Sequence, residues 1–134
     1  MNKDEPAVDL SKVLVVAKSP INRIVMAKIV ERSSLRPVVD SPETAAATLR
    51  SLIPGAIILD GGVDNKDCDG LTSAIAAVRC GADGPLPAVI LLSNRNGTPE
   101  SLDLSEIIDV VVAKPITPEK LQPVIERLIA LART

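Results

Sequence analysis

The sequence contains no phenylalanine, tyrosine, tryptophan or histidine. Without aromatic rings the chain cannot stack nucleic-acid bases or a flavin, which argues against single-stranded nucleic-acid binding by stacking. Without histidine it lacks the side chain that proteins use most often as a general base and metal ligand. A formal net charge of −2 also disfavours an electrostatic surface for DNA or RNA. We therefore expect no nucleic-acid partner.

Long apolar runs are absent as well. No segment approaches the roughly 18 consecutive apolar residues that span a bilayer, and the polar N-terminus does not resemble a signal peptide. Cys68 and Cys80 are expected to be free thiols, because two cysteines in an unexported chain rarely pair. We predict a cytoplasmic protein that does not enter a membrane.

What the sequence does contain is a regular alternation of apolar runs and helical patterns. Its 134 residues predict a polar N-terminal tail at 1–11 and a single domain at 12–134. Short apolar runs predict buried strands; they occupy residues 13–17, 38–39, 56–59, 88–92 and 107–113. Such strands, separated by helices, predict an α/β protein with a doubly wound, five-stranded parallel sheet.

The helical segments begin with recurring signals. A hydroxyl residue, a proline and an acid open the segments at 41–43, 98–100 and 117–119, and residues 19–20 repeat the first two. A further helix is expected from about Leu71 to Cys80. In the helix near Pro20, the apolar residues that share one face are Ile21, Ile24, Val25 and Ile29. In the last helix, Pro123 requires either a kink or a later start.

Polar residues stand where the predicted strands end. Asp60, Ser93 and Lys114 each follow an apolar run, and Ala17–Lys18 follows the first one. Because ligands and reactive groups of doubly wound sheets lie beyond the carboxyl ends of the strands, these residues are expected to converge. A carboxylate, a hydroxyl and an ammonium at one edge form the candidate site.

These residues resemble the receiver domain of bacterial two-component response regulators. The segment AIILD ends in Asp60, VILLS ends in Ser93, and VVAKP contains Lys114 followed by proline. The resemblance spans residues 12–132 and implies a flavodoxin-like (βα)5 fold with strand order 2-1-3-4-5. It implies that Asp60 is the phosphoacceptor, Lys114 the phosphoryl-binding cation and Ser93 the switch hydroxyl. The backbone at Gly62 would lie near the site.

The first strand departs from the receiver pattern. Ala17 and Lys18 stand where receivers commonly have two acids that hold Mg²⁺. Asp60, Lys18 and Lys114 together carry a formal charge of +1, so we predict weak or absent Mg²⁺ binding and no other cofactor. Lys18 either pairs with Asp60 in place of the metal or extends its charge into solvent. We favour pairing with Asp60.

Two further departures concern the parts that transmit a signal in receivers. The loop at 61–69 is longer than usual, and Val111 stands where an aromatic switch residue is expected. The resemblance implies a stand-alone receiver, not an enzyme, that is phosphorylated by a histidine kinase or phosphotransfer protein. It would dock a downstream protein through residues 99–133. The alternatives are a phosphorylation-independent interaction module or a small-molecule enzyme on the same fold.

Overall fold

The computed structural model describes residues 7–62, 66–81, 87–95, 97–102, 104 and 106–132. Its strands are β1 (Ala7–Val16), β2 (Arg36–Asp40), β3 (Leu52–Asp60), β4 (Ala88–Ser93) and β5 (Val110–Ala113). Its helices are α1 (Pro20–Arg32), α2 (Pro42–Leu49), α3 (Thr72–Gly81) and α4 (Pro118–Ala132), and a short 3₁₀ turn, η1 (Asp69–Leu71), precedes α3.

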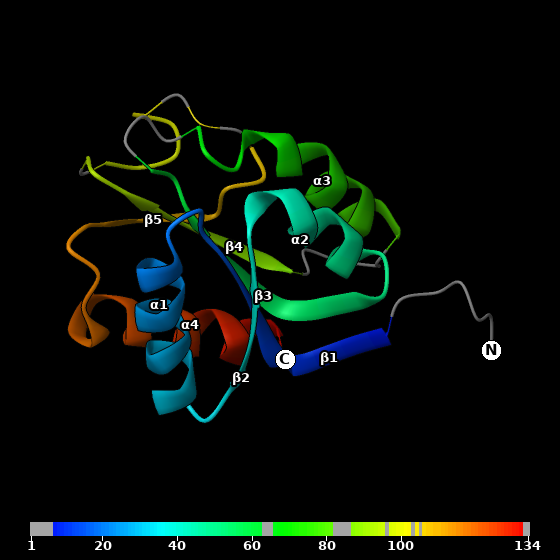
Figure 1. Ribbon diagram of the computed structural model, residues 1–134, viewed down its shortest axis with the longest axis horizontal. Coiled ribbons are helices and arrows are strands. Elements are labelled where there is room, and N and C mark those ends of the chain that lie inside the picture. The colour runs from blue at the N-terminus through cyan, green and yellow to red at the C-terminus, as the bar shows by residue number, and fades with distance from the viewer. Residues whose placement is uncertain are drawn as a thin grey trace.

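The strands form one parallel sheet in the order β2-β1-β3-β4-β5, which confirms the predicted fold and topology (Figure 1). β3 lies at the centre, and every residue from Ile53 to Asp60 is buried. In the register, Val16 lies beside Leu59, and Asp60 lies beside Leu92. The carboxyl ends of the strands therefore meet along one edge of the sheet.

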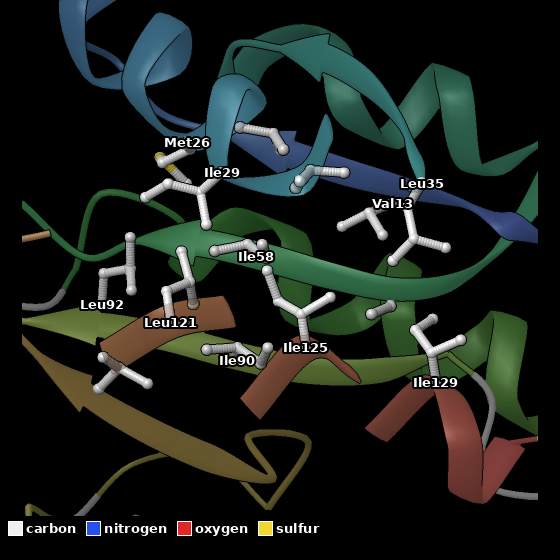
Figure 2. Packing of buried hydrophobic residues seen from close by; sticks show 14 of the residues in the cluster. Val13, Met26, Ile29, Leu35, Ile58, Ile90, Leu92, Leu121, Ile125 and Ile129 are labelled. Carbon is white, nitrogen blue, oxygen red and sulfur yellow. The ribbon is translucent and has the colours of Figure 1, made fainter. Parts of the chain in front are cut away.

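Helices cover both faces of the sheet (Figure 1). On one face, α1 and α4 pack against side chains such as Val13, Ile58 and Ile90, as Figure 2 shows. On the other face, α2 and α3 pack against alternate residues of the same strands, including Leu14 and Ile57. Burying each aliphatic side chain contributes about 1.5–3 kcal/mol to folding, so these two layers supply the main stabilisation.

The N-terminal boundary differs from the prediction of a tail at 1–11. Residues 7–11 belong to β1, where Ala7 pairs with Leu52 and Asp9 pairs with Pro54. The register shifts between Asp9 and Val13, and the Asp9 carboxylate accepts hydrogen bonds from Ser11 N at 3.0 Å and Ser11 Oγ at 2.5 Å. The polar residues of this segment thus bond to each other at an irregularity in the strand, which lets the strand continue past them.

The segment between β4 and β5 also differs, because a helix was expected to start at 98–100. Thr98 and Ser101 exchange hydrogen bonds as a helix start does, with Thr98 N at 2.8 Å from Ser101 Oγ. The described residues of this segment nevertheless form turns and no α-helix. Leu102 N donates to the Thr98 carbonyl at 3.1 Å and Leu104 N donates to the Pro99 carbonyl at 2.9 Å, so these bonds close single turns. The described chain therefore has four α-helices rather than about five.

Helix α1 is rotated relative to the face suggested by its sequence. Ile21 is 72% exposed, Ile24 is 57% exposed and Val25 is 36% exposed. The residues of α1 that are buried are Met26, Ile29 and Val30. The rotation turns Asn22 towards the sheet, where its side chain contacts Asp60. The helix thus presents an aliphatic surface to solvent and a polar side chain to the end of β3.

Helix α4 begins at the predicted proline, Pro118, and continues through Pro123. Proline at position 123 lacks the N–H that would bond to the carbonyl of Glu119, so the second turn loses one hydrogen bond. The buried side chains of Leu121, Ile125 and Ile129 hold the helix on the sheet (Figure 2). No helix in the described ranges is both long enough and apolar enough to cross a membrane.

Candidate functional site

The structure brings Asp60, Ser93 and Lys114 together at the carboxyl edge of the sheet. The Lys114 ammonium lies 2.6 Å from Asp60 Oδ1. Asp60 is only 3% exposed and Ser93 is fully buried. The Ser93 hydroxyl accepts a hydrogen bond from the backbone N of Arg95 at 3.0 Å. The backbone carbonyl of Ser93 accepts a hydrogen bond from the backbone N of Lys114 at 2.7 Å. A buried carboxylate and an ammonium are thus in contact at this edge of the sheet.

Asp60 has two further hydrogen-bond donors. The backbone N of Gly62 lies 3.0 Å from Oδ1, and the side-chain amide of Asn22 lies 2.6 Å from Oδ2. Gly62 was expected near this site from the sequence, whereas Asn22 was not. A polar residue in the first turn of the helix that follows the β1 end was the available signal, because that turn lies over the same edge of the sheet.

These contacts set the ionisation of Asp60. Burial of the carboxyl raises its pKa, and hydrogen bonds from Lys114, Gly62 and Asn22, with the charge of Lys114, more than reverse that effect. The pKa of Asp60 therefore lies below its ordinary value of 3.8. The charge that lowers the pKa is that of Lys114. The carboxylate is held as an anion at neutral pH.

Comparison with known proteins gives matches only at the level of structure, since no protein-family model and no curated protein matches the sequence. A chemotaxis response regulator, CheY4 of Vibrio cholerae, superposes with a TM-score of 0.69 at 20% identity, over 90% of this chain and 99% of that one. A CheY-like receiver domain protein from Methanospirillum hungatei superposes with a TM-score of 0.70 at 16% identity, covering 93% and 98%. The chain has the receiver fold.

A third structure with this fold is the receiver domain of a sensor histidine kinase from Pseudomonas aeruginosa. It superposes with a TM-score of 0.66 at 23% identity, over 89% of this chain and 97% of that one. That receiver domain holds a magnesium ion in its active-site cleft. A shared fold does not fix the chemistry of a site, which depends on the residues present in this chain.

The predicted ion pair between Lys18 and Asp60 is wrong. Lys18 Nζ lies 3.6 Å from Asp67 Oδ1, and the Lys18 side chain is 57% exposed. The donors of Lys114, Gly62 and Asn22 already surround the Asp60 carboxylate. Lys18 therefore extends towards solvent, which was the alternative prediction from the sequence, and its ammonium pairs with Asp67 on the loop after β3.

The residues at the receiver metal position do not fit a divalent cation. Ala17 is fully buried in the hydrophobic core and its side chain has no ligand atom. Its carbonyl oxygen accepts a hydrogen bond from the Arg23 guanidinium at 3.1 Å. Asp60 and Asp67 pair with Lys114 and Lys18, and the Arg23 guanidinium adds one positive charge beside Ala17, so these five groups sum to +1. The missing ligand atom and the net positive charge both disfavour a divalent cation at this position.

The loop after β3 is held close to the site by backbone and side-chain contacts. Gly62 has φ of +74°, a conformation that suits glycine, and an added Cβ there would collide with the Asp67 carboxylate. The Gly62 carbonyl accepts a hydrogen bond from Asn94 Nδ2 at 3.2 Å. Asp67 N donates to the Gly61 carbonyl at 3.2 Å. Residues 63–65 of the lengthened loop at 61–69 lie outside the described residues.

Cys68 is a free, buried thiol next to the site. Its Sγ lies 3.4 Å from the Asp60 carbonyl oxygen. Burial, followed by the charges of Asp67 and Asp60, raises the pKa of Cys68 to about 12. The thiol is thus protonated at neutral pH and belongs to the packing beneath the loop rather than to a reactive centre. The side chain of Cys80 lies outside the described residues.

Proposed function

We propose that this chain is an atypical receiver module that signals through protein contacts, with Asp60 as its phosphoacceptor. The observation that carries this proposal is the 2.6 Å ion pair between Lys114 Nζ and Asp60 Oδ1 at the end of the central strand. A buried carboxylate beside a fixed ammonium can receive a phosphoryl group and neutralise part of its charge. The receiver fold supports this reading over a small-molecule enzyme.

The proposed chemistry is transfer of a phosphoryl group to Asp60. A carboxylate oxygen attacks phosphorus and forms an acyl phosphate, while the bond from phosphorus to the donor breaks and the donor keeps the electron pair. Lys114 then binds a phosphoryl oxygen. Ser93 lies at the end of the neighbouring strand, where its hydroxyl can exchange the Arg95 amide for the new group. The donor would be a histidine kinase or a phosphotransfer protein.

We also propose that the pocket binds Mg²⁺ weakly or not at all. Ala17 offers no ligand, and Asp60 is already paired with Lys114. A single ammonium neutralises less charge than a divalent ion and cannot coordinate two oxygens, so phosphorylation should be slow. Lys18 contributes little to the acceptor, because its ammonium lies beside Asp67.

A second candidate function is a module that docks proteins without phosphorylation. It is favoured by one observation, namely that both Asp60 oxygens already have donors, with Asn22 2.6 Å from Oδ2. A carboxylate that is fully hydrogen-bonded is a weaker nucleophile, since its charge is already stabilised in the ground state. The two functions differ in whether Asp60 gains mass from a phosphodonor.

Intact-mass spectrometry after incubation with acetyl phosphate, with and without Mg²⁺, separates the two candidates. Under the first, the protein gains one phosphoryl group slowly, Mg²⁺ changes the rate little, and Asp60→Asn abolishes the gain. Asp69→Asn is the matched control, because Asp69 is exposed in η1 and should leave the gain intact. No gain over hours in the folded wild type would favour the docking module.

For the downstream partner we propose the surface built from residues 99–133, of which 103, 105 and 133 are not described. Within it, α4 exposes Leu131, which is 63% exposed, while its opposite face is buried in the core. Leu131→Glu should weaken binding of a partner that uses this surface, with little effect on folding. Binding that survives this change, measured by calorimetry with an identified partner, would assign docking to another face.

A further inference from the structure

One side chain links the candidate phosphoacceptor to a helix. Asn22 Nδ2 on α1 donates to Asp60 Oδ2 at 2.6 Å, while the other carboxylate oxygen is used by Lys114 and Gly62. Asn22 lies in the first turn of α1, where its backbone N donates to the capping Ser19 Oγ at 3.3 Å. The start of α1 is therefore tied to the end of β3 by a short, charge-assisted hydrogen bond.

On the β4 and β5 side of the site, the described residues do not connect Asp60 to an α-helix. The described residues between β4 and β5 form turns without an α-helix, and Val111 on β5 has no ring to reorient. The Ser93 hydroxyl, which lies on β4, already accepts a hydrogen bond from the Arg95 amide. Among the described residues, the hydrogen bond that joins the Asp60 carboxylate to an α-helix thus comes from Asn22 and leads to α1.

Helix α1 also carries a group of exposed aliphatic side chains. Ile21, Ile24 and Val25 lie on its outer side, in the first two turns of the helix, with Ile21 72% exposed. The opposite side of α1 is anchored by Met26 and Ile29, which are buried in the core. A change at the first turn would alter this outer surface while the rest of the helix stays packed.

We infer that α1 is the element that responds to the state of Asp60, and that Asn22 transmits the change. Any group added to Oδ2, or any loss of the carboxylate charge, removes or weakens the acceptor of the Asn22 amide. The first turn of α1 then loses a restraint and opens more often. The inference rests on the proposed function only in naming the phosphoryl group as the natural trigger; the link itself exists without phosphorylation.

Hydrogen exchange of the α1 amides, followed by NMR, tests the link with a double-mutant cycle. Asn22→Ala and Asp60→Ala should each speed exchange at residues 22–26 by roughly tenfold, and the double variant should be no faster than either single one. Alanine favours helix over asparagine, so a faster rate in Asn22→Ala cannot come from intrinsic helix propensity. If Asp60→Ala does not fold, Asp60→Asn replaces it, with a smaller effect in the same direction because an amide oxygen is a weaker acceptor.

Asn94→Ala is the matched control, because Asn94 donates to the Gly62 carbonyl in the same region, whereas the donors to the Asp60 carboxylate in the described part of the chain are Asn22, Gly62 and Lys114. It should leave exchange at residues 22–26 unchanged. Additive effects of the Asn22 and Asp60 variants, or unchanged α1 exchange in Asp60→Ala, would overturn the inference.

A second measurement uses the absence of aromatic residues. Ile24→Trp places the only fluorophore on the outer side of α1, and its emission should shift when Asp60→Ala is added and not shift when Asn94→Ala is added. An emission spectrum that is the same in both backgrounds contradicts the inference. If acetyl phosphate adds no mass but the effects of the Asn22 and Asp60 variants on exchange are non-additive, the link between Asn22 and α1 stands and the proposed acceptor role of Asp60 fails. If acetyl phosphate adds mass but these effects are additive, the acceptor role stands and the link fails.

Discussion

Lys114 and Asp60 form an ion pair across a strand that separates them. Asp60 ends β3 and Lys114 follows β5, whereas β4 lies between those two strands in the sheet. The 2.6 Å separation of Nζ and Oδ1 therefore depends on the lysine side chain reaching past the end of β4, where Ser93 is buried. The pair thus links the end of β3 to the residue that follows β5, past the end of β4.

Replacing Lys114 with methionine should destabilise the fold. The variant Lys114→Met leaves the buried Asp60 carboxylate with only the Asn22 and Gly62 donors. Removing one partner of a largely buried ion pair leaves a charge without its counter-charge, and we expect a loss of about 2 kcal/mol at neutral pH. Urea unfolding followed by circular dichroism measures this. Lys120→Met, an exposed lysine on α4, should change stability by less than about 0.5 kcal/mol.

The stability that Asp60 contributes should depend on pH. Its pKa is lower in the folded protein than its ordinary value of 3.8, so the folded state binds this proton less readily than the unfolded state. The contribution is therefore complete above the unfolded pKa and disappears as pH falls through the lower folded value. Asp60→Asn should be less stable than wild type by about 1–2 kcal/mol at pH 6. That difference should shrink below about pH 4; a difference that is the same at pH 6 and pH 3 would contradict the assignment.

Introducing two acids at the end of β1 should create a metal site. The double variant Ala17→Asp, Lys18→Asp adds ligand atoms beside Asp60 and should bind Mg²⁺ at least about tenfold more tightly than wild type. Amide shifts near Asp60 during a Mg²⁺ titration measure the affinity, and Mg²⁺ should also raise the Tm of the double variant. Lys28→Asp, which changes charge at an exposed position of α1, is the control and should gain no binding at Asp60. If the folded double variant does not bind, the loop at 61–69 is the better explanation.

Gly62 should tolerate no side chain. Gly62→Ala places a Cβ at φ +74° and against the Asp67 carboxylate, so we expect a loss of about 1–2 kcal/mol in the free energy of unfolding. Gly70→Ala is the matched control, because an added Cβ at Gly70 meets no atom within 4 Å. Urea unfolding should show Gly70→Ala within about 0.5 kcal/mol of wild type. Equal effects of the two substitutions would mean that the close approach of Asp67 is not maintained in solution.

The thiol of Cys68 should be protected in the folded state. Burial raises its pKa to about 12, so few thiolates exist at pH 8 and reagent reaches them only when the loop opens. In the variant Cys80→Ser, which isolates Cys68, Ellman's reagent should react at least about a thousandfold more slowly than with the urea-unfolded chain. Rapid labelling of the native variant would show that the loop over Cys68 is open.

The architecture followed from the sequence because it depends on local periodicity. Continuous apolar runs identified strands that are buried on both faces, and the proline-containing starts located α2 and α4. The carboxyl ends of parallel strands must lie on one edge, so the meeting of Asp60, Ser93 and Lys114 also followed from the order of elements. No distance was needed for these conclusions.

Other features were decided only by tertiary structure. The partner of Lys18 is Asp67 instead of Asp60, because Lys114 and Asn22 reach the carboxylate from other elements. The rotation of α1 could not be read from its pattern, since aliphatic residues occur on both of its sides and the contact of Asn22 with β3 belongs to the folded chain. Sequence periodicity determines which segments become strands and helices, whereas the reach of side chains between distant elements decides which charges meet.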